Sequence, residues 1–279
     1  MRSTSEPSTP VGNRPPLWLR TGSWATRRFA SLNRVHQRLL ALRNRWLTPG
    51  IVRLEQAVGD ADSLLEVGCG DNSPLAWFTR KPAQSVGVDL FEPALERSRE
   101  AGIHSEYRCL DVLDIGAHFA PDSIDAVVAF DLIEHLTEPD GLRLLEQMER
   151  IARKRVVVFT PNGWLQQGEY GGNPWQVHQS GWSAERMQEL GYTVRGLSGL
   201  RWLRGEYATP RWRPHQLWKL VSAGTQPIAY RYPRLAFQIL CVKQTDPSSP
   251  SGSGRSGSHR TRASAPGWPQ RTPAPPENG

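Results

Sequence analysis

The stretch LLEVGCGDNSPL, residues 64–75, contains residues whose types and spacing can bind a nucleoside. An apolar run leads directly into Gly68 and Gly70, and glycine lets the backbone of such a turn come close to a ligand. Asp89 ends the next apolar run, and its carboxylate can accept two hydrogen bonds from a ribose diol. These residues predict a pocket for an adenosine cofactor, and taken alone they leave a dinucleotide as an alternative.

Three further features favour S-adenosylmethionine over a dinucleotide. A dinucleotide fingerprint has a third glycine where this chain has Ser73, so that a helix N-terminus can meet the pyrophosphate. Glu66, two residues before the first glycine, would repel a pyrophosphate but suits the ammonium and sulfonium groups of S-adenosylmethionine. The chain also ends with a helix and two strands, not with a second mononucleotide-binding half.

Strands and helices alternate through the middle of the chain. Buried-type strands are predicted at residues 63–67, 85–89, 107–110, 124–130 and 156–159. Helices are predicted at residues 51–58, 74–80, 93–101 and 141–153. Such alternation is typical of crossover units in a parallel sheet, where ligands bind beyond the carboxyl ends of the strands.

The pattern changes after residue 160. A helix over 183–190 precedes strands at 192–197 and 235–242, which we expect to pair antiparallel at the sheet edge. Residues 199–233 are too many for a plain loop and predict an inserted helical lid. The expected fold class is therefore α/β, with a doubly wound, mostly parallel seven-stranded sheet, an antiparallel last strand and a helical insertion.

Five segments resemble, in order and spacing, the motifs of the class I S-adenosylmethionine-dependent methyltransferases. They are LLEVGCGDNSPL (64–75), VGVDL (86–90), CLDVLDI (109–115), IDAVVAFDLIEHL (124–136) and RVVVFTPNG (155–163). The resemblance is close over residues 64–162 and looser up to residue 242. It implies a Rossmann-like fold, S-adenosylmethionine as cofactor and methyl transfer as the activity.

The resemblance also limits the chemical class of the acceptor and implies roles for residues around the cofactor. DLIEHL and TPNG look most like the branch that includes quinone, sugar and natural-product enzymes, which implies a small-molecule or lipid-linked acceptor, methylated at oxygen, with nitrogen and carbon as alternatives. Glu66, Gly68 and Gly70 would line the methionine part, and Asp89 would hold the ribose hydroxyls. The other positions carried over are Leu90 against the adenine, Asp111 and Val112 at the adenine edge, and Phe130 and Asp131 on the floor beside the methyl group.

A hydroxyl acceptor needs a base as well as a position in line with the methyl carbon. The candidate bases are His135, at the expected start of a helix facing the cofactor, and His178, in a polar segment after the fifth strand. Each has a structural alternative, since His135 can buttress the site and His178 can bond within its loop. Asp131, Glu134 and His135 also resemble an acid-x-x-Glu-His cluster that could bind a divalent cation in some quinone-pathway enzymes, but three ligands of mixed spacing do not lead us to expect a metal.

Basic charge is concentrated at the two ends of the chain. Residues 1–50 contain nine Arg and one acid, and residues 244–279 contain four Arg and two acids, so the overall +7 leaves −3 for residues 51–243. We expect residues 1–16 and 244–279 to be disordered, residues 17–48 to form a basic amphipathic helix and residues 49–243 to form the methyltransferase domain. The basic helix is a candidate for peripheral membrane contact, with a solvated helix face as the alternative.

The composition of the chain argues against several other classes of protein. Three widely spaced cysteines argue against a disulfide framework or a zinc site and fit a reducing cytoplasm. No apolar run approaches the roughly 20 residues that span a bilayer, and the N-terminus lacks the apolar region of a signal peptide. The expected location is cytoplasmic, with membrane attachment as an addition, and the oligomeric state is left open. A non-catalytic scaffold is the alternative to an enzyme.

Two groups of aromatic residues have open roles. Those after the fifth strand can wall an acceptor pocket or pack their own loop: Trp164, Tyr170, Trp175 and Trp182. Those of the insertion alternate with arginines and can contact nucleic acid or a lipid surface: Trp202, Trp212 and Trp218. No RNA-binding motif accompanies them, so nucleic acid is not the expected partner.

Overall fold

A computed structural model describes residues 49–168, 174–205 and 209–245 of the chain. The predicted N-terminal helix at 17–48, the predicted disordered N-terminus and nearly all of the predicted C-terminal tail lie outside these residues. The last strand continues to Gln244, one residue beyond the predicted end of the domain.

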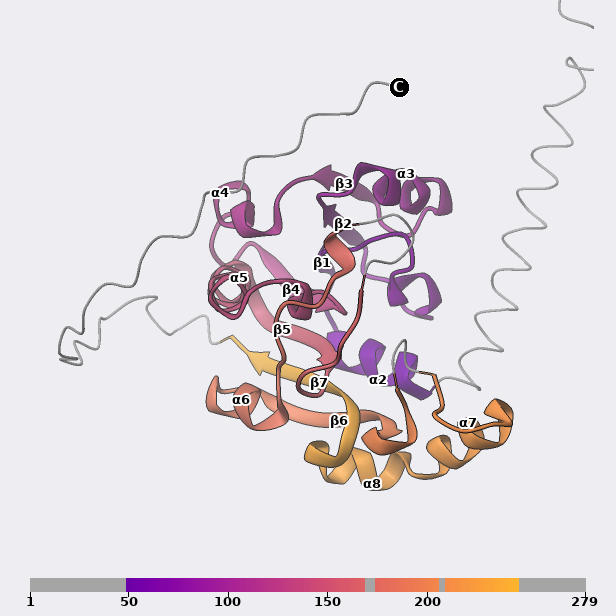
Figure 1. Ribbon diagram of the computed structural model, residues 1–279. Helices are drawn as coiled ribbons and strands as arrows, with labels where there is room; N and C mark the ends of the chain where they lie inside the picture. The colour runs from indigo at the N-terminus through magenta and orange to yellow at the C-terminus, as the bar shows by residue number, and fades with distance from the viewer. Residues whose placement is uncertain (1–48, 169–173, 206–208, 246–279) are drawn as a thin grey trace, which may run out of the picture. The chain divides into compact units, whose positions relative to one another are not determined.

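Seven strands form one sheet in the order β3-β2-β1-β4-β5-β7-β6 (Figure 1). Their bounds are β1 Ser63–Val67, β2 Gln84–Asp89, β3 Glu106–Cys109, β4 Ile124–Phe130, β5 Ala152–Pro161, β6 Thr193–Leu200 and β7 Ala236–Gln244. Strands β1 to β5 pair in parallel, and β7 runs antiparallel to both of its neighbours. The predicted fold class is confirmed, and so is the antiparallel pairing of the last two strands, although β6 and not β7 occupies the sheet edge.

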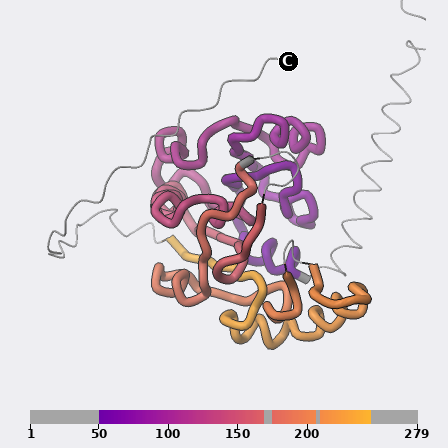
Figure 2. The backbone as a smooth tube through the Cα atoms, viewed as in Figure 1, coloured from indigo at the N-terminus to yellow at the C-terminus, as the bar shows by residue number. Residues whose placement is uncertain are grey.

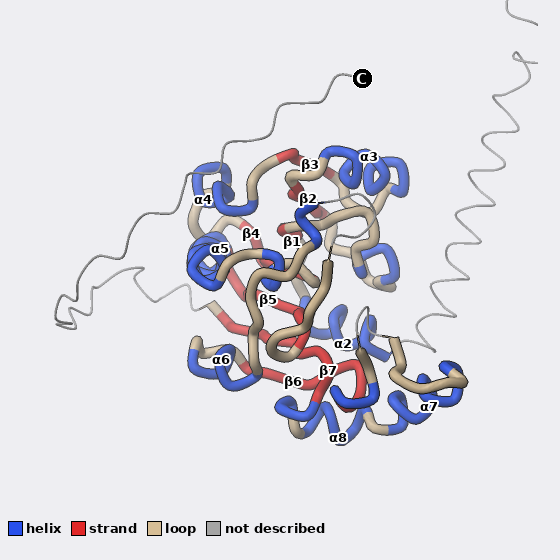
Figure 3. Tube along the Cα trace, viewed as in Figure 1, coloured by secondary structure: helices blue, strands red, loops and turns tan. Residues whose placement is uncertain are grey.

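Alternating residues of the strands pack into two cores on opposite faces of the sheet. Leu64 joins Leu54 and Val58 of α2 (Pro49–Val58), whereas the neighbouring Leu65 joins residues of α5 (Glu138–Ile151). Successive side chains of a strand point to opposite faces, so adjacent apolar residues require a covered sheet on both sides. Helix α6 (Ala184–Glu189) belongs to the second core through Met187. Figure 3 shows the helices around the red strands.

Two short helices lie between β6 and β7, where a helical insertion is expected. Helix α7 comprises His215–Gly224 and α8 comprises Gln226–Arg231. Ala229 of α8 is fully buried against Gly196 of β6, where an added Cβ would lie 2.1 Å from the Ala229 carbonyl oxygen. Helix α8 therefore packs on the body of the edge strand, and the predicted lid role of this insertion stays a prediction.

The sequence prediction was wrong for some helices around the site. The helix expected at 74–80 is a single 3-10 turn, η2 (Pro74–Trp77), because Ser73 caps it and the chain becomes extended at Phe78. His135 does not begin a long helix either, since it ends the 3-10 turn η4 (Ile133–His135) before α5. Helices α3 (Glu92–Ala101), α5 and α6 match expected helices, whereas the short α4 (Ile115–His118) was not predicted.

Candidate functional site

The turn after β1 has the backbone geometry that glycine provides. Gly68 and Gly70 have φ of 68° and 50°, in the left-handed region that favours glycine. Gly68 donates its N–H to the Val88 carbonyl at 2.7 Å, and a Cβ here would meet the Leu132 side chain at 2.4 Å. A Cβ at Gly70 would meet nothing within 4 Å, so this part of the turn faces open space beyond the strand ends.

Asp89, at the end of β2, is fastened to the same turn. Its Oδ2 accepts the N–H of Gly70 at 2.8 Å, and its Oδ1 accepts the N–H of Phe91 at 2.9 Å. Desolvation by burial raises the pKa of this carboxyl, and the backbone N–H groups oppose that shift. Each oxygen keeps a further lone pair, which is the acceptor set that a ribose diol requires.

Glu66 lies behind the turn, where its side chain is almost completely buried. Its Oε2 accepts the Ser73 hydroxyl at 2.6 Å and contacts Nε2 of the equally buried His104 at 2.8 Å. The carboxylate thus ties the end of β1 to the start of η2 and to the chain before β3. Its predicted contact with the methionine part of the cofactor stays a prediction, and His104 is a partner that sequence reasoning missed.

The predicted adenine side of the site is more open. Leu90 is 41% exposed, and Asp111 is exposed next to the buried Val112. Asp111 also caps the turn η3 (Val112–Asp114), because its Oδ1 accepts the Leu113 N–H at 2.9 Å. The second oxygen of Asp111 is available to an exocyclic amine.

Phe130 and Asp131 stand where β4 ends. Phe130 is 5% exposed, whereas Asp131 is reached by solvent and has φ of 47°, a strained value for a residue other than glycine. The Gln238 side chain, from β7, donates to Asp131 Oδ1 at 3.1 Å. Partial desolvation raises the pKa of Asp131, and the Gln238 hydrogen bond opposes that shift.

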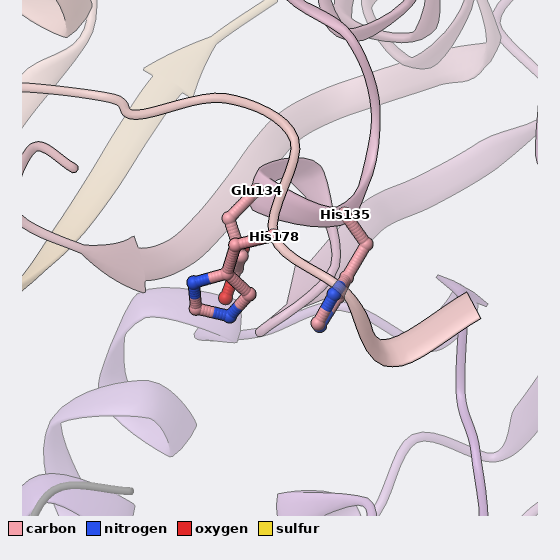
Figure 4. Close-up of side chains that lie close together, drawn as sticks. All are labelled: Glu134, His135 and His178. Carbon is pink, nitrogen blue, oxygen red and sulfur yellow. The ribbon is translucent and has the colours of Figure 1, made fainter. Parts of the chain in front are cut away.

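The two predicted bases lie together, although 42 residues separate them in sequence. The ring centroids of His135 and His178 are 4.8 Å apart, edge to face. Figure 4 shows His135 and Glu134 on η4 and His178 on the connection between β5 and α6. This connection runs back beside η4, where the Gln179 and Ser180 N–H groups donate to the Glu134 carbonyl and the Gln179 side chain donates to the His135 carbonyl (Figure 2).

Both histidines are held in the neutral form by their surroundings. Burial and the neighbouring His178 lower the pKa of His135 to about 4, and burial also lowers the pKa of His178. The Nδ1 of His178 donates to the Leu165 carbonyl at 2.7 Å, which leaves its Nε2 as an acceptor. His135 Nδ1 is buried without a hydrogen-bond partner among the described residues.

Glu134 completes a cluster with the two histidines. Its Oε2 accepts the Thr160 hydroxyl at 2.9 Å, and burial together with the charge of Asp131 raises the pKa of Glu134. One ligand atom from each of Glu134, His135 and His178 lies within 4.8 Å of the others. Two imidazoles and a carboxylate, with one ring nitrogen unpartnered, fit a divalent cation. His178, and not Asp131, is the third member of this cluster, which differs from the acid-x-x-Glu-His cluster considered above.

The aromatic residues after β5 divide into two kinds. Trp182 is fully buried, and its Nε1 donates to the Ser180 hydroxyl at 2.9 Å, so it packs the connection onto η4. Trp164 and Trp175 are 59% and 47% exposed, and Tyr170 lies outside the described residues.

The sequence analysis did not identify His104 or Gln238 as residues of the site. The spacing of apolar residues along the chain does not indicate them, because each reaches the site from a distant segment.

The sheet topology and the glycine turn agree with the resemblance to the class I, S-adenosylmethionine-dependent methyltransferases. In agreement, residues 65–160 match the family described as Methyltransferase domain. The matched segment begins in β1 and ends in β5, so it contains the glycine turn, Asp89 and η4.

Two curated relatives are named Ubiquinone biosynthesis O-methyltransferase. The one from Chromobacterium violaceum is 30% identical over 106 residues, covering 37% of this chain and 41% of the relative. The one from Neisseria meningitidis is 34% identical over 118 residues, covering 39% and 48%. The chain thus spans less than half the length of these relatives. A solved SAM dependent methyltransferase from Archaeoglobus fulgidus is 15% identical over 75% of this chain and 94% of its own, with a TM-score of 0.47.

Proposed function

We propose that the protein transfers the methyl group of S-adenosylmethionine to an oxygen of a small-molecule or lipid-linked acceptor. The observation that carries this proposal is the glycine turn hydrogen-bonded to Asp89, without the third glycine of a dinucleotide site and with Asp131 directly after the neighbouring strand β4. Acidic groups suit a cationic sulfonium and oppose a pyrophosphate. The names of the two curated relatives support oxygen as the accepting atom.

When bound, S-adenosylmethionine supplies an activated methyl group and its own leaving group. The work left to the protein is to orient the acceptor and to remove the hydroxyl proton. His178 suits the second task because its Nδ1–H is engaged by Leu165 and its Nε2 carries a free lone pair. That Nε2 would accept the acceptor O–H proton, while the glycine turn and Asp89 would hold the cofactor that supplies the methyl group and departs without it. His135 packs against the His178 ring and orients it.

The test is product formation from labelled donor. We would incubate the full-length protein with methyl-labelled S-adenosylmethionine and pooled cell extract, and identify labelled products by mass spectrometry. A labelled methyl ether is the expected result. His178→Ala should slow its formation by 10²-fold or more, about the contribution of a general base, while leaving cofactor affinity by calorimetry nearly unchanged. Absence of cofactor binding would instead support a non-catalytic scaffold, and an undiminished rate in His178→Ala would remove the base assignment.

A second candidate role, metal-assisted deprotonation, follows from the cluster of Glu134, His135 and His178. A bound cation would polarise the acceptor oxygen and lower the pKa of its hydroxyl. Purified protein should then contain a stoichiometric transition metal by elemental analysis, and Glu134→Gln should lose it. Glu138→Gln, an exposed acid on the next turn, is the matched control. Metal-free protein with full activity after chelator dialysis would exclude this role.

A further inference from the structure

Helix α7 exposes a face of aliphatic side chains to water. The folding of a single chain does not require these side chains to be exposed. Leu217, Leu220 and Val221 are 52%, 72% and 38% exposed. Their spacing of three and four residues places them on one face of the helix. Ser222 is the buried residue of α7, so the helix is attached to the domain by a polar contact and turns its aliphatic side chains outward.

Tryptophan extends this face beyond the helix. Trp212 is 45% exposed, and its ring lies 4.8 Å from that of Trp218 on α7. Arg211 and Arg213 flank Trp212 in the sequence. Ile228 of the following helix α8 is 49% exposed, and Tyr232, directly after the end of that helix, is 56% exposed. Adjacent exposed aliphatic and aromatic side chains mark an interaction surface, unlike single scattered ones.

The same segment is strongly basic. Residues 199–233 contain six Arg or Lys and one acid, Glu206, which gives a net charge of +5. Residues 51–243 as a whole carry −3, so the insertion differs in sign from the domain that carries it. A surface of this kind attracts polyanions and repels other basic surfaces.

We propose that this insertion surface, formed by residues 211–221 with Ile228 and Tyr232, docks onto a bilayer that contains anionic lipids. Apolar side chains on one face of a short helix enter the boundary between headgroups and acyl chains. Tryptophan rings prefer that boundary, and arginine and lysine pair with the phosphate groups above it. None of the described helices is long and apolar enough to cross a membrane, so contact at the surface is the mode that fits α7.

Charge decides against other occupants of the surface. In a symmetric dimer the surface would face its own copy and bring two sets of positive charge together. The chain's own residues 1–50 carry a net +8 and would be repelled in the same way. Nucleic acid could pair its phosphates with the basic residues and stack its bases on the indole rings. It offers no apolar surface, however, that could bury the side chains of Leu217 and Leu220.

Vesicle flotation tests this proposal without any need for methyl transfer. The full-length protein should float with vesicles of equal parts phosphatidylcholine and phosphatidylglycerol, and much less with phosphatidylcholine alone. The double variant Leu217→Ser/Leu220→Ser should lower the partition coefficient about tenfold or more, because two side chains no longer leave water. Arg211→Gln/Arg213→Gln should lower it about fivefold for each charge removed, on anionic vesicles only.

The matched control is Gln216→Ser/Ala223→Ser, which alters exposed positions on another face of the same helix and should float like the wild-type protein. Equal flotation of the wild type and the leucine variant would overturn the proposal, because the binding would then come from elsewhere in the chain. A dimer in sedimentation that the leucine variant dissociates, with no flotation, would also overturn it. So would an RNA mobility shift that depends on Trp212 in protein that does not float.

Discussion

Asp89 combines two tasks at the scale of a single side chain. Its carboxylate holds the Gly70 amide in place and still has lone pairs for a ligand. An amide at this position would keep one acceptor oxygen but would turn an N–H donor toward another donor. The charge of this residue therefore matters for the shape of the turn as well as for ligand binding.

Asp89→Asn should weaken binding of S-adenosylmethionine about 10- to 100-fold, since a hydrogen bond to a charged group is worth about 1.5–3 kcal/mol. Isothermal titration calorimetry measures this directly. Asp114→Asn, an exposed acid at the end of η3, serves as the control and should bind normally. Wild-type affinity in Asp89→Asn would show that the ribose does not lie at the end of β2.

Glu66 and His104 form a buried polar pair that has a structural role. Both side chains are nearly inaccessible, and the pair joins the end of β1 to the segment that enters β3. Removing one member of such a pair leaves an uncompensated polar group inside the protein, which is costly. Their position behind the glycine turn makes them supports of the pocket, whatever part Glu66 plays toward the ligand.

At the level of secondary structure, one carboxylate connects several strands at the end of the sheet opposite the site. Asp125 of β4 accepts the Asp62 N–H at 2.9 Å and pairs with Arg153 and Lys154 of β5. Burial by itself would raise the pKa of Asp125, but these three partners outweigh it and lower the pKa to about 2. One carboxylate thus connects the starts of β1, β4 and β5.

This carboxylate should make stability depend on pH in a defined window. A carboxyl whose pKa is lower in the folded state contributes stability above its unfolded pKa of about 4, and that contribution disappears as the pH falls toward about 2. Since Arg153 and Lys154 are partly exposed, we expect about 1–2 kcal/mol after allowing for solvent screening.

Urea unfolding between about pH 6 and pH 3 measures this window. The wild-type protein should lose more stability on acidification than Asp125→Asn does. Glu100→Gln, an exposed residue of α3, should behave like the wild type. Parallel pH profiles for the wild type and Asp125→Asn would contradict the assignment.

At the scale of the whole domain, Asn162 joins segments from three parts of the chain. Its Nδ2 donates to the carbonyls of Pro233, Arg234 and Ala236 at 3.0 to 3.2 Å, and its Oδ1 accepts the Ala184 N–H at 3.1 Å. The end of β5, the start of α6 and the entry to β7 therefore meet at one buried amide. This contact sets where the connection that carries His178 begins.

Asn162→Asp should destabilise the protein by about 3 kcal/mol, because a carboxylate would face carbonyl oxygens and a buried donor would be lost. The shift in the midpoint of urea unfolding measures the loss. Gln188→Glu, the same amide-to-acid change at an exposed position of α6, should leave the midpoint nearly unchanged. Equal midpoints for Asn162→Asp and the wild type would show that this junction contributes little to the fold.

The strands, their alternation with helices, and the glycine turn with its acid at Asp89 could all be predicted from the sequence. These features are local, because strand burial follows from apolar runs and the turn follows from glycines at two fixed positions. The mostly parallel direction of the strands then followed from their alternation with helices, whereas the order of the strands in the sheet came from the structure. The helix expected at 74–80 failed because the cap at Ser73 and the extended Phe78 limit it to one turn.

Which side chains meet across the site depends on the packing of distant segments and could not be predicted from the sequence. His135 and His178 are adjacent because the connection after β5 bonds back to η4, and His104 reaches Glu66 from 38 residues away. Gln238 reaches Asp131 because β7 runs antiparallel beside β5. The sequence pattern likewise did not reveal the exposed aliphatic face of α7, because an apolar stripe predicts burial. Only the packed domain shows that this stripe is exposed among the residues the structure describes.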